Sequence, residues 1–304
     1  MTLRPKPDSA VLEGPPALDP RARVEGERAT GALWLIPVPI GNLEDITLRA
    51  ARMLEAVSLV ACEDTRTTRQ LLSLLNLTPP QLMSCHEHNE RKQSARVLEL
   101  LEAGEDVALV SDAGSPAISD PGARLVRAVI DAGYAVSALP GPCALTTALS
   151  ASGLSTERFL FVGFLPSKGS ARRKALSAYV SLPYTLICYE SPHRLEKTLL
   201  DASELFGADR QAVIARELTK RFECYRRGPL GALVQDPGVV KGELVLLIEG
   251  ADPSAPTSER DLKSLVAEVL SLNLSPSASA KWLRERSDLT RQQAYELLRG
   301  ARER

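Results

Sequence analysis

The sequence predicts an α/β protein in which two α/β domains are followed by a helical extension. Short apolar runs alternate with helical segments from about residue 31, and the alternation restarts near residue 153 without a self-similar repeat. Strands and helices that alternate in this way form a mostly parallel sheet covered on both faces. Three helical segments come last. With 304 residues, the chain has room for about two or three domains.

The chain divides into five predicted parts. Its start is rich in proline and charge and cannot bury enough apolar surface to fold, so we expect a disordered tail. A stretch of small residues and prolines from Gly250 to Pro256 indicates a linker. The predicted parts are the tail over 1–30, an N-terminal α/β domain over 31–152, a C-terminal α/β domain over 153–250, the linker over 251–257 and a helical extension over 258–304.

Short apolar runs bounded by glycine or proline give the predicted strands. In the N-terminal domain, strands are predicted over 33–38, 58–62, 107–110 and 135–139, with helices over 47–56 and 121–132. In the C-terminal domain, strands are predicted over 159–164, 184–189, 212–215 and 244–248, with helices over 169–181 and 195–206. The last three helices, over 259–270, 276–286 and 291–299, match a helix-turn-helix unit in size, although simple helical packing gives this pattern more often.

Composition excludes several classes of protein. Apolar residues make up 44% of the chain, enough for hydrophobic cores, and no run of about 18 apolar residues predicts a membrane span. The N-terminus has no apolar signal-peptide core, so we expect a cytoplasmic protein. The 37 basic and 38 acidic residues give a net charge of −1, so nucleic-acid binding would have to rest on local basic patches. Five scattered cysteines indicate reduced thiols, with neither a disulfide framework nor a structural metal.

Four loops after predicted strands combine glycine, proline and short polar residues. Because ligands bind at the carboxyl ends of strands in open parallel sheets, these loops predict a ligand site. Glycine lets the backbone approach a ligand closely, and proline holds a loop in one shape. No dinucleotide fingerprint, phosphate-binding P-loop or nucleophile elbow is present in the sequence. The four loops are 39–42, 62–66, 111–122 and 140–143.

Nine motifs, in order along the chain, give it a resemblance to a known family. They are LWLIPVPIGNLEDITLRA (33–50), EDTR (63–66), HEHNE (86–90), SDAGSPAISDPG (111–122), PGP (140–142), FVGFLP (161–166), YESPHR (189–194), ARELTK (215–220) and KGE (241–243). Over residues 31–250 the chain resembles the bacterial 2′-O-cytidine methyltransferases of small-subunit ribosomal RNA, within the tetrapyrrole methylase superfamily. The resemblance implies a two-domain tetrapyrrole-methylase-like fold, and the final helices resemble the helix-turn-helix extension that many members carry.

The resemblance also implies an activity. It predicts a homodimer that binds S-adenosylmethionine and methylates the ribose 2′-hydroxyl of a decoding-region cytidine in 16S rRNA of the small ribosomal subunit. Seven residues match the cofactor cleft of the superfamily: Pro39, Gly41, Asp112, Gly114, Ile118, Pro140 and Thr147. Asp112 would accept hydrogen bonds from the cofactor, unless it only caps the turn that follows it. Two residues depart from the family pattern, Cys143 in place of serine and Ser115 in place of threonine, and both are small enough to line a ligand pocket.

A ribose hydroxyl is a poor nucleophile, so a base that accepts its proton would help the reaction. We favour the pair Glu63 and Asp64. These two residues directly follow a predicted strand, and we expect them to lie beside the first glycine loop. Histidines 86, 88 and 193 are individually more often structural, and the pair at 86 and 88 has no third metal ligand nearby. Further candidates for the base are Glu87, Glu90, Glu190, His193 and Glu217.

Clusters of basic residues predict contacts with RNA phosphates. Residues 167–174 carry four basic and no acidic side chains, and residues 216–227 carry five basic and two acidic ones with Phe222 and Tyr225 between them. Arg66 and Arg69, with Arg91 and Lys92, add a third group of basic residues near the predicted ligand loops. Any one such cluster is usually a solvated face, but three near one site favour RNA. The predicted RNA-binding residues are Arg66, Lys168, Arg172, Arg173, Lys174, Arg194 and Lys220.

Two other functions compete with this prediction. The same fold hosts small-molecule methyltransferases that act on tetrapyrroles, which would be expected to lack the basic clusters and the final helices. A non-catalytic RNA- or ribosome-binding module is the other alternative, and the intact glycine loops argue against it.

Overall fold

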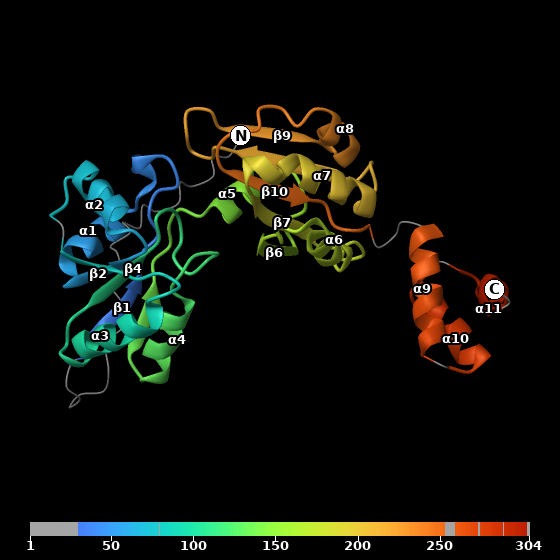
Figure 1. Cartoon of the computed structure of the whole chain (residues 1–304), viewed down its shortest axis with the longest axis horizontal. Coiled ribbons are helices and arrows are strands. Elements are labelled where there is room, and N and C mark those ends of the chain that lie inside the picture. The colour runs from blue at the N-terminus through green and yellow to red at the C-terminus, as the bar shows by residue number, and fades with distance from the viewer. Residues whose placement is uncertain (1–29, 79, 253–258, 273, 288, 303–304) are drawn as a thin grey trace, which may run out of the picture. The chain divides into compact units, whose positions relative to one another are not determined.

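The computed structural model describes residues 30–78, 80–252, 259–272, 274–287 and 289–302 (Figure 1). The predicted tail and most of the predicted linker lie outside these residues. The chain forms two compact units, residues 1–180 with 184–250 and residues 181–183 with 251–304. Both sheets belong to the first unit. The predicted division of that unit at residue 152 stays a prediction.

The first sheet confirms the predicted parallel α/β arrangement. Its strand order is β3-β2-β4-β1-β5, and every neighbouring pair is parallel. Four of its strands were predicted, and β3 was not. The strands are β1 (Ala32–Leu35), β2 (Leu59–Cys62), β3 (Gln81–Ser84), β4 (Val107–Val110) and β5 (Ala135–Ala138).

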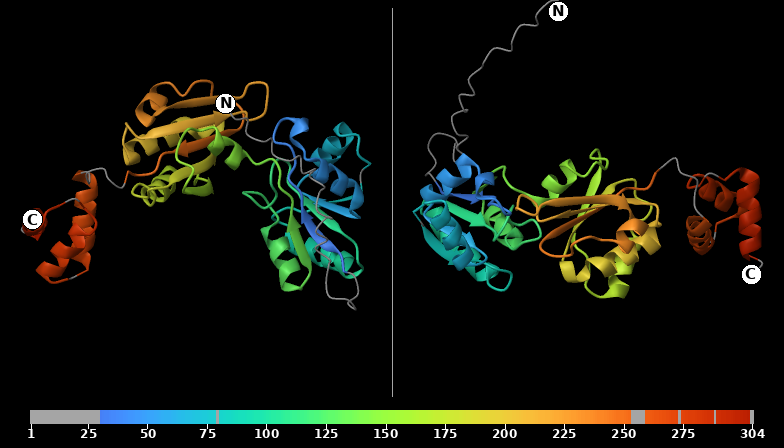
Figure 2. Two further views of the ribbon diagram at one scale, coloured as in Figure 1. Left: turned by 180° about the vertical axis from the view of Figure 1, so that it is seen from behind. Right: turned by 90° about the horizontal axis from the view of Figure 1, so that it is seen from above.

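Helices cover both faces of this sheet (Figures 1 and 2). Successive strand residues point to opposite faces, so Leu33 packs on one side and Trp34 on the other. The helices are α1 (Leu48–Ala56) and α2 (Thr65–Leu74) on the Trp34 side, and α3 (Glu90–Glu102) and α4 (Ala123–Asp131) on the Leu33 side. Helix α1 begins where predicted, because the Thr47 side chain caps it by accepting from the Ala50 N–H at 3.0 Å.

The second sheet is mixed. Its order is β6-β7-β10-β8-β9, with β6 and β7 parallel and the other pairs antiparallel. Strand β9 was not predicted. The elements are β6 (Phe159–Phe164), α6 (Gly169–Ser177), β7 (Thr185–Glu190), α7 (Pro192–Phe206), β8 (Gln211–Arg216), β9 (Cys224–Pro229), α8 (Leu230–Gln235) and β10 (Leu244–Ile248). Helices α6, α7 and α8 pack on one face, and α5 (Ala144–Ser150) packs on the other.

The second unit holds three helices that share a core of their own. They are α9 (Glu259–Ser271), α10 (Pro276–Arg284) and α11 (Arg291–Arg302), close to the predicted ranges. Val269, Leu283 and Ala294, one from each helix, are buried together. The predicted C-terminal helices are therefore confirmed. None of the helices in the described residues has the length and apolar content that a membrane span requires.

Candidate active site

The site is built where the connections of the first sheet diverge. Strands β1 and β4 are neighbours, but the chain leaves them toward opposite edges of the sheet, and such a switch point opens a crevice at the strand ends. Val38 after β1 and Gly114 after β4 join the two loops through paired backbone hydrogen bonds of 2.9 Å. Gly114 has φ +75°, and a Cβ there would lie 3.2 Å from the Ile40 side chain. A glycine is therefore required at this crossing.

A cavity of about 320 Å³, here called the inter-sheet cavity, opens beside this crossing. Most of its wall is apolar, and residues from both sheets contribute to it. The loop after β4 supplies one side, and the ends of β6, β7 and β10 supply the other. Its lining includes Ile40, Ala113, Gly114, Ser115, Ile118, Ser119, Asp120, Cys143, Phe164, Tyr189, Leu218, Gly242 and Val245.

Aromatic rings form part of this wall. Tyr189 packs edge-on against Phe161 and Phe164, with ring centroids 4.9 Å and 5.6 Å away. Phe164 remains 56% exposed. Burial raises the pKa of Tyr189, so its phenol is neutral near pH 7. The wall therefore offers flat apolar surfaces with one neutral hydroxyl.

The predicted cofactor residues are distributed around this cavity. Gly114 and Ile118 line it, and Pro39 and Gly41 flank the lining residue Ile40. A Cβ on Gly41 would lie 2.4 Å from Cγ of Lys220, which explains the glycine.

The remaining three predicted cofactor residues are placed differently. Pro140 starts the turn that leads to the lining residue Cys143, and the Thr147 carbonyl accepts a 3.1 Å hydrogen bond from the Tyr225 hydroxyl. Asp112 lines a second cavity, and its carboxylate accepts from the Asp64 N–H at 3.2 Å. This hydrogen bond joins the loop to the segment after β2, and it is a different contact from the predicted cap of the turn that follows Asp112.

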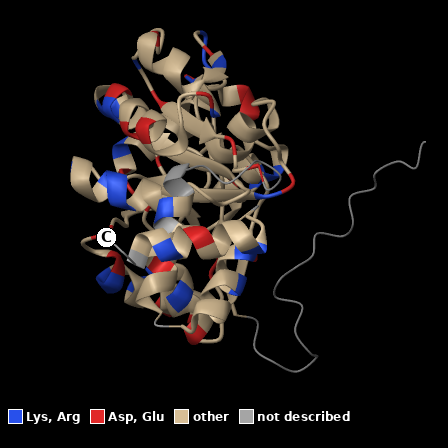
Figure 3. Cartoon of the chain, turned by 90° about the vertical axis from the view of Figure 1, so that its right-hand side faces the viewer, with Lys and Arg blue, Asp and Glu red and all other residues tan. Residues whose placement is uncertain are grey.

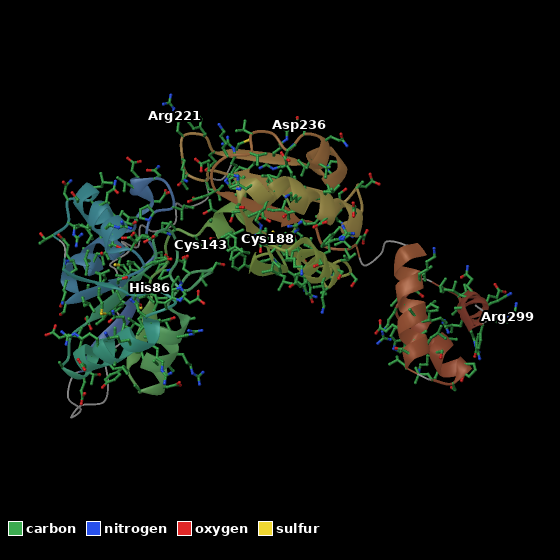
Figure 4. All side chains as sticks on the ribbon, in the orientation of Figure 1. His86, Cys143, Cys188, Arg221, Asp236 and Arg299 are labelled. Atoms are coloured by element: carbon green, nitrogen blue, oxygen red, sulfur yellow. The ribbon has the colours of Figure 1, made fainter. Side chains whose placement is uncertain are left out.

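Both departures from the expected motif lie in the wall of the inter-sheet cavity. The Ser115 hydroxyl donates to the Pro142 carbonyl at 3.1 Å, which ties two of the predicted ligand loops together. Cys143 is half-buried and lines the cavity with its neighbour Ala144 (Figure 4). Each small side chain fits the wall without a clash.

The second cavity, here called the strand-end cavity, measures about 430 Å³ and is polar. It opens at the carboxyl ends of β2, β3 and β4, and it is lined by Glu63, Asp64, Thr65, Arg66, Ser84, His86 and Asp112. The prediction that Glu63 and Asp64 lie beside the first glycine loop was wrong. Strand β4 stands between β1 and β2, so their neighbour is the loop of residues 111–122.

The two favoured base candidates have different environments. Asp64 caps α2 by accepting from the Arg66 N–H at 2.8 Å, and it pairs with the Arg66 guanidinium at 2.6 Å. These hydrogen bonds to Arg66 lower the pKa of Asp64 to about 2, which makes it a weak base. Burial and the nearby Asp112 carboxylate raise the pKa of Glu63. Glu63 is therefore the stronger base of the pair.

One acidic residue of this site escaped the sequence reasoning. Asp120 lines the inter-sheet cavity, and burial together with the Glu63 and Asp112 carboxylates raises its pKa to about 6. The available signal was a second acid in one predicted ligand loop, eight residues after Asp112 and directly before Pro121-Gly122.

The predicted RNA-binding residues fall into two groups. Arg172 is only 5% exposed and pairs with Asp201 at 2.7 Å, so the expectation that it faces RNA does not agree with its burial. Arg173 pairs with Asp201 and Glu204 at 2.9 Å and 2.5 Å. These two arginines join α6 to α7.

Arg194 and Lys220 also serve the fold. Arg194 donates to the Leu165 carbonyl and pairs with Glu190, and the Lys220 ammonium lies 3.0 Å from Glu217 and 3.1 Å from Glu243.

The other predicted RNA-binding residues are open to solvent. Lys168 and Lys174 are exposed at the two ends of the basic cluster. Arg66 is 85% exposed although it pairs with Asp64. In the view of Figure 3, basic and acidic residues are interspersed along the helices. Among the described residues, no group of three or more His, Cys, Asp and Glu side chains could hold a metal ion.

Comparison with known proteins identifies the family. Residues 32–234 match the family model of the Tetrapyrrole (Corrin/Porphyrin) Methylases. The chain belongs to this family. It is 47% identical over 250 residues to the ribosomal RNA small subunit methyltransferase I of Pseudomonas aeruginosa, which covers 81% of this chain and 88% of that protein. The Micromonospora olivasterospora protein of the same name is 43% identical over 295 residues, covering 93% of each chain.

Solved tetrapyrrole methylases share the fold. The methyltransferase CobJ superposes with a TM-score of 0.56 at 18% identity, covering 73% of this chain and 95% of that one. A uroporphyrin-III C-methyltransferase from Thermus thermophilus, complexed with S-adenosylhomocysteine, gives a TM-score of 0.52 at 16% identity over 72% of this chain and 97% of that one. The predicted tetrapyrrole-methylase-like fold is confirmed, and so is membership in a family of methyltransferases that depend on S-adenosylmethionine.

Proposed function

We propose that this chain transfers the methyl group of S-adenosylmethionine to the ribose 2′-hydroxyl of a decoding-region cytidine in 16S rRNA. The observation that carries the proposal is the similarity to small-subunit rRNA methyltransferases, which extends over 81% of the chain. The switch-point crevice supports it, because that is where open α/β sheets bind ligands.

The residues of the inter-sheet cavity fit S-adenosylmethionine. A cavity of about 320 Å³ with flat apolar walls suits the adenine ring of this cofactor, and Gly114 lets the backbone come close. Gly114 and Ile118 would contact the cofactor directly. Asp112 would accept hydrogen bonds from the cofactor. The loops around the cofactor would be shaped by Pro39, Gly41, Pro140 and Thr147. When bound, the cofactor supplies an electrophilic methyl group on a positively charged sulfur.

The side chains of the cavity then have two tasks. Methyl transfer from a sulfonium is an in-line displacement, so catalysis depends on alignment of the two reactants and on exclusion of water. Phe164 and Tyr189 line the cavity, with Phe161 packed against Tyr189, and this aromatic wall would exclude water and orient the ligand. A nearby carboxylate accepts the proton of the attacking hydroxyl.

RNA would be held by exposed side chains near the cavity. Lys168 and Lys174 are free to contact phosphates, and Arg66 stands exposed at the strand-end cavity. The exposed ring of Phe164 offers a surface on which an unstacked base can lie. Arg172, Arg173, Arg194 and Lys220 support these elements from within.

We further propose that the protein is a cytoplasmic homodimer, as the family resemblance implies. Its proposed substrate is a part of the ribosome, which places it in the cytoplasm. Sedimentation equilibrium across a range of concentrations tests the dimer, and a constant mass of one chain would contradict it.

The proposed reaction is tested by transfer of labelled methyl to 30S subunits from cells that lack this modification. Mass spectrometry of the product should place one methyl group on a cytidine ribose. The tetrapyrrole alternative predicts transfer to a porphyrinogen and none to RNA, and that result would overturn the proposal. Binding of RNA without uptake of S-adenosylmethionine would instead support a non-catalytic module.

A further inference from the structure

The two cavities share one wall. Within the loop of residues 111–122, Asp112 lines the strand-end cavity, whereas Ala113, Gly114 and Asp120 line the inter-sheet cavity. The Asp112 carboxylate also fixes this loop to the end of β2 by accepting from the Asp64 N–H. This one loop therefore contributes to the walls of both cavities.

The strand-end cavity has the chemistry of a hydroxyl-rich ligand. Its wall presents the Ser84 hydroxyl, the His86 imidazole and the Glu63 and Asp112 carboxylates. The His86 Nδ1 atom is buried and has no hydrogen-bond partner among the residues that the structure describes. A buried polar atom without a partner is costly, so a ligand that supplies a hydrogen bond there would be stabilised. A ribose, with its hydroxyls, meets this requirement.

Asp120 lines the inter-sheet cavity and is close enough to Glu63 and Asp112, which line the strand-end cavity, for their charges to act on it. Ala117 and Ser119 have φ of +66° and +64°, a backbone region that residues other than glycine rarely adopt. Gly122 has φ +128°, and a Cβ there would lie 2.7 Å from the Leu109 side chain. Strained positions of this kind persist only where the surroundings hold them, and they cluster at functional sites. These strained positions lie on both sides of Asp120 in the sequence.

We propose that the strand-end cavity receives the target ribose and that Asp120, in the wall of the inter-sheet cavity, accepts the proton of the 2′-hydroxyl. This inference rests on the proposed function. Asp120 takes the role that was predicted for Asp64, because the Asp64 carboxylate already pairs with the Arg66 guanidinium and caps α2.

The step balances as a single displacement. The 2′-oxygen forms a bond to the methyl carbon of S-adenosylmethionine while the carbon–sulfur bond breaks and its electron pair stays on sulfur. The hydroxyl proton moves to the Asp120 carboxylate and is later released to water. The products are the 2′-O-methyl ribose and S-adenosylhomocysteine, whose sulfur is uncharged.

The charges around Asp120 suit this role. Burial raises the pKa of Asp120 most, Glu63 at the end of β2 and Asp112 in the same loop raise it further, and the hydrogen bond with Ser111 lowers it. Tyr189 on β7 is close enough to Asp120 for their charges to interact, and the charge of His86 lowers the pKa of Glu63. With a pKa of about 6, Asp120 is a carboxylate above that pH and is protonated below it. The rate of methyl transfer should therefore rise as the pH increases through about 6.

The test is the single-turnover rate of methyl transfer to 30S subunits between about pH 5.5 and 8.5, with the affinity for S-adenosylmethionine measured by calorimetry. Asp120→Asn should lower the rate by about 10²–10⁴-fold and leave the cofactor affinity close to that of the wild type. Glu63→Gln removes one negative neighbour of Asp120, so the acidic limb of its pH–rate profile should move to lower pH. His86→Ala should raise the KM for 30S subunits without changing cofactor affinity. Asp131→Asn, on the exposed end of α4, is the matched control.

Each failure has a distinct meaning. If wild-type protein modifies no RNA, the proposed function fails. If the wild type is active and Asp120→Asn is equally active, Asp120 is not the base. A parallel loss of rate and of cofactor affinity would make Asp120 a cofactor ligand. An unmoved acidic limb in Glu63→Gln would also overturn the assignment of the base, and an unchanged KM in His86→Ala would overturn the placement of the ribose.

Discussion

At the scale of single residues, the site depends on positions where only one residue type fits. Gly114 combines a positive φ with a Cβ position 3.2 Å from Ile40, and it pairs with Val38 at the crossing of two ligand loops. The sequence showed that this loop matters, because glycine and proline are concentrated there. It did not show which acid in the loop would have a raised pKa, since that shift comes from partial burial in the fold and from Glu63, which is remote in sequence.

Gly114→Ala should destabilise the protein and weaken cofactor binding. The left-handed conformation costs an alanine about 1–2 kcal/mol, and the added methyl group pushes against the Ile40 wall of the inter-sheet cavity. Urea unfolding measures the first effect, and calorimetry with S-adenosylmethionine measures the second. Gly133→Ala is the control, because it has a similar φ of +83° but nothing within 4 Å of the added Cβ, so it should affect stability alone.

At the scale of elements, short strands with apolar sequences were predictable, including the edge strands β5 and β6, whereas the more polar edge strands β3 and β9 were not. Strand β4 reads Val-Ala-Leu-Val and is buried throughout, whereas the edge strand β9 carries Arg226 and Arg227 and resembles a basic surface cluster. Strand β3 is also an edge strand and is partly exposed. The order of the strands brings Glu63 to the loop after β4, and no local pattern encodes that order.

The junction of α6 and α7 gives a stability prediction. Arg172→Ala should lower the free energy of unfolding by about 3 kcal/mol, because it leaves the buried Asp201 carboxylate with only Arg173. Urea unfolding of Arg172→Ala beside Lys174→Ala measures the difference. Equal stability of the two variants would contradict the buried pairing.

The exposed lysines of the same segment give a binding prediction. Lys168→Ala combined with Lys174→Ala should weaken binding to 30S subunits. The slope of the logarithm of the binding constant against the logarithm of the salt concentration should become shallower by about 0.7–0.9 for each phosphate contact that is lost. Cofactor affinity should not change. The measurement is the binding constant at several salt concentrations, and an unchanged slope would remove these lysines from the RNA surface. A double variant of Lys281 and Arg284, in the other compact unit, serves as a comparison.

At the scale of the whole molecule, the two compact units have separate cores. The six buried core residues of α9–α11 come only from those helices, and both sheets lie in the other unit. A chain that ends at Gly250 should therefore retain the unfolding midpoint of the larger unit and its affinity for S-adenosylmethionine. Loss of affinity for 30S subunits in that chain would assign RNA contact to the helices. Failure of the shortened chain to fold would contradict the independence of the cores.

The loop of residues 111–122 contributes to the walls of both the inter-sheet and strand-end cavities. A ligand that orders this loop from one cavity reduces the conformational entropy that a ligand in the other cavity must still lose. S-adenosylmethionine, the methyl donor, and 30S subunits, which carry the methyl acceptor, should consequently bind with positive cooperativity. Thermodynamic linkage requires the same coupling factor in both directions. Bound 30S subunits should therefore increase the affinity for S-adenosylmethionine by the same factor as bound S-adenosylmethionine increases the affinity for 30S subunits.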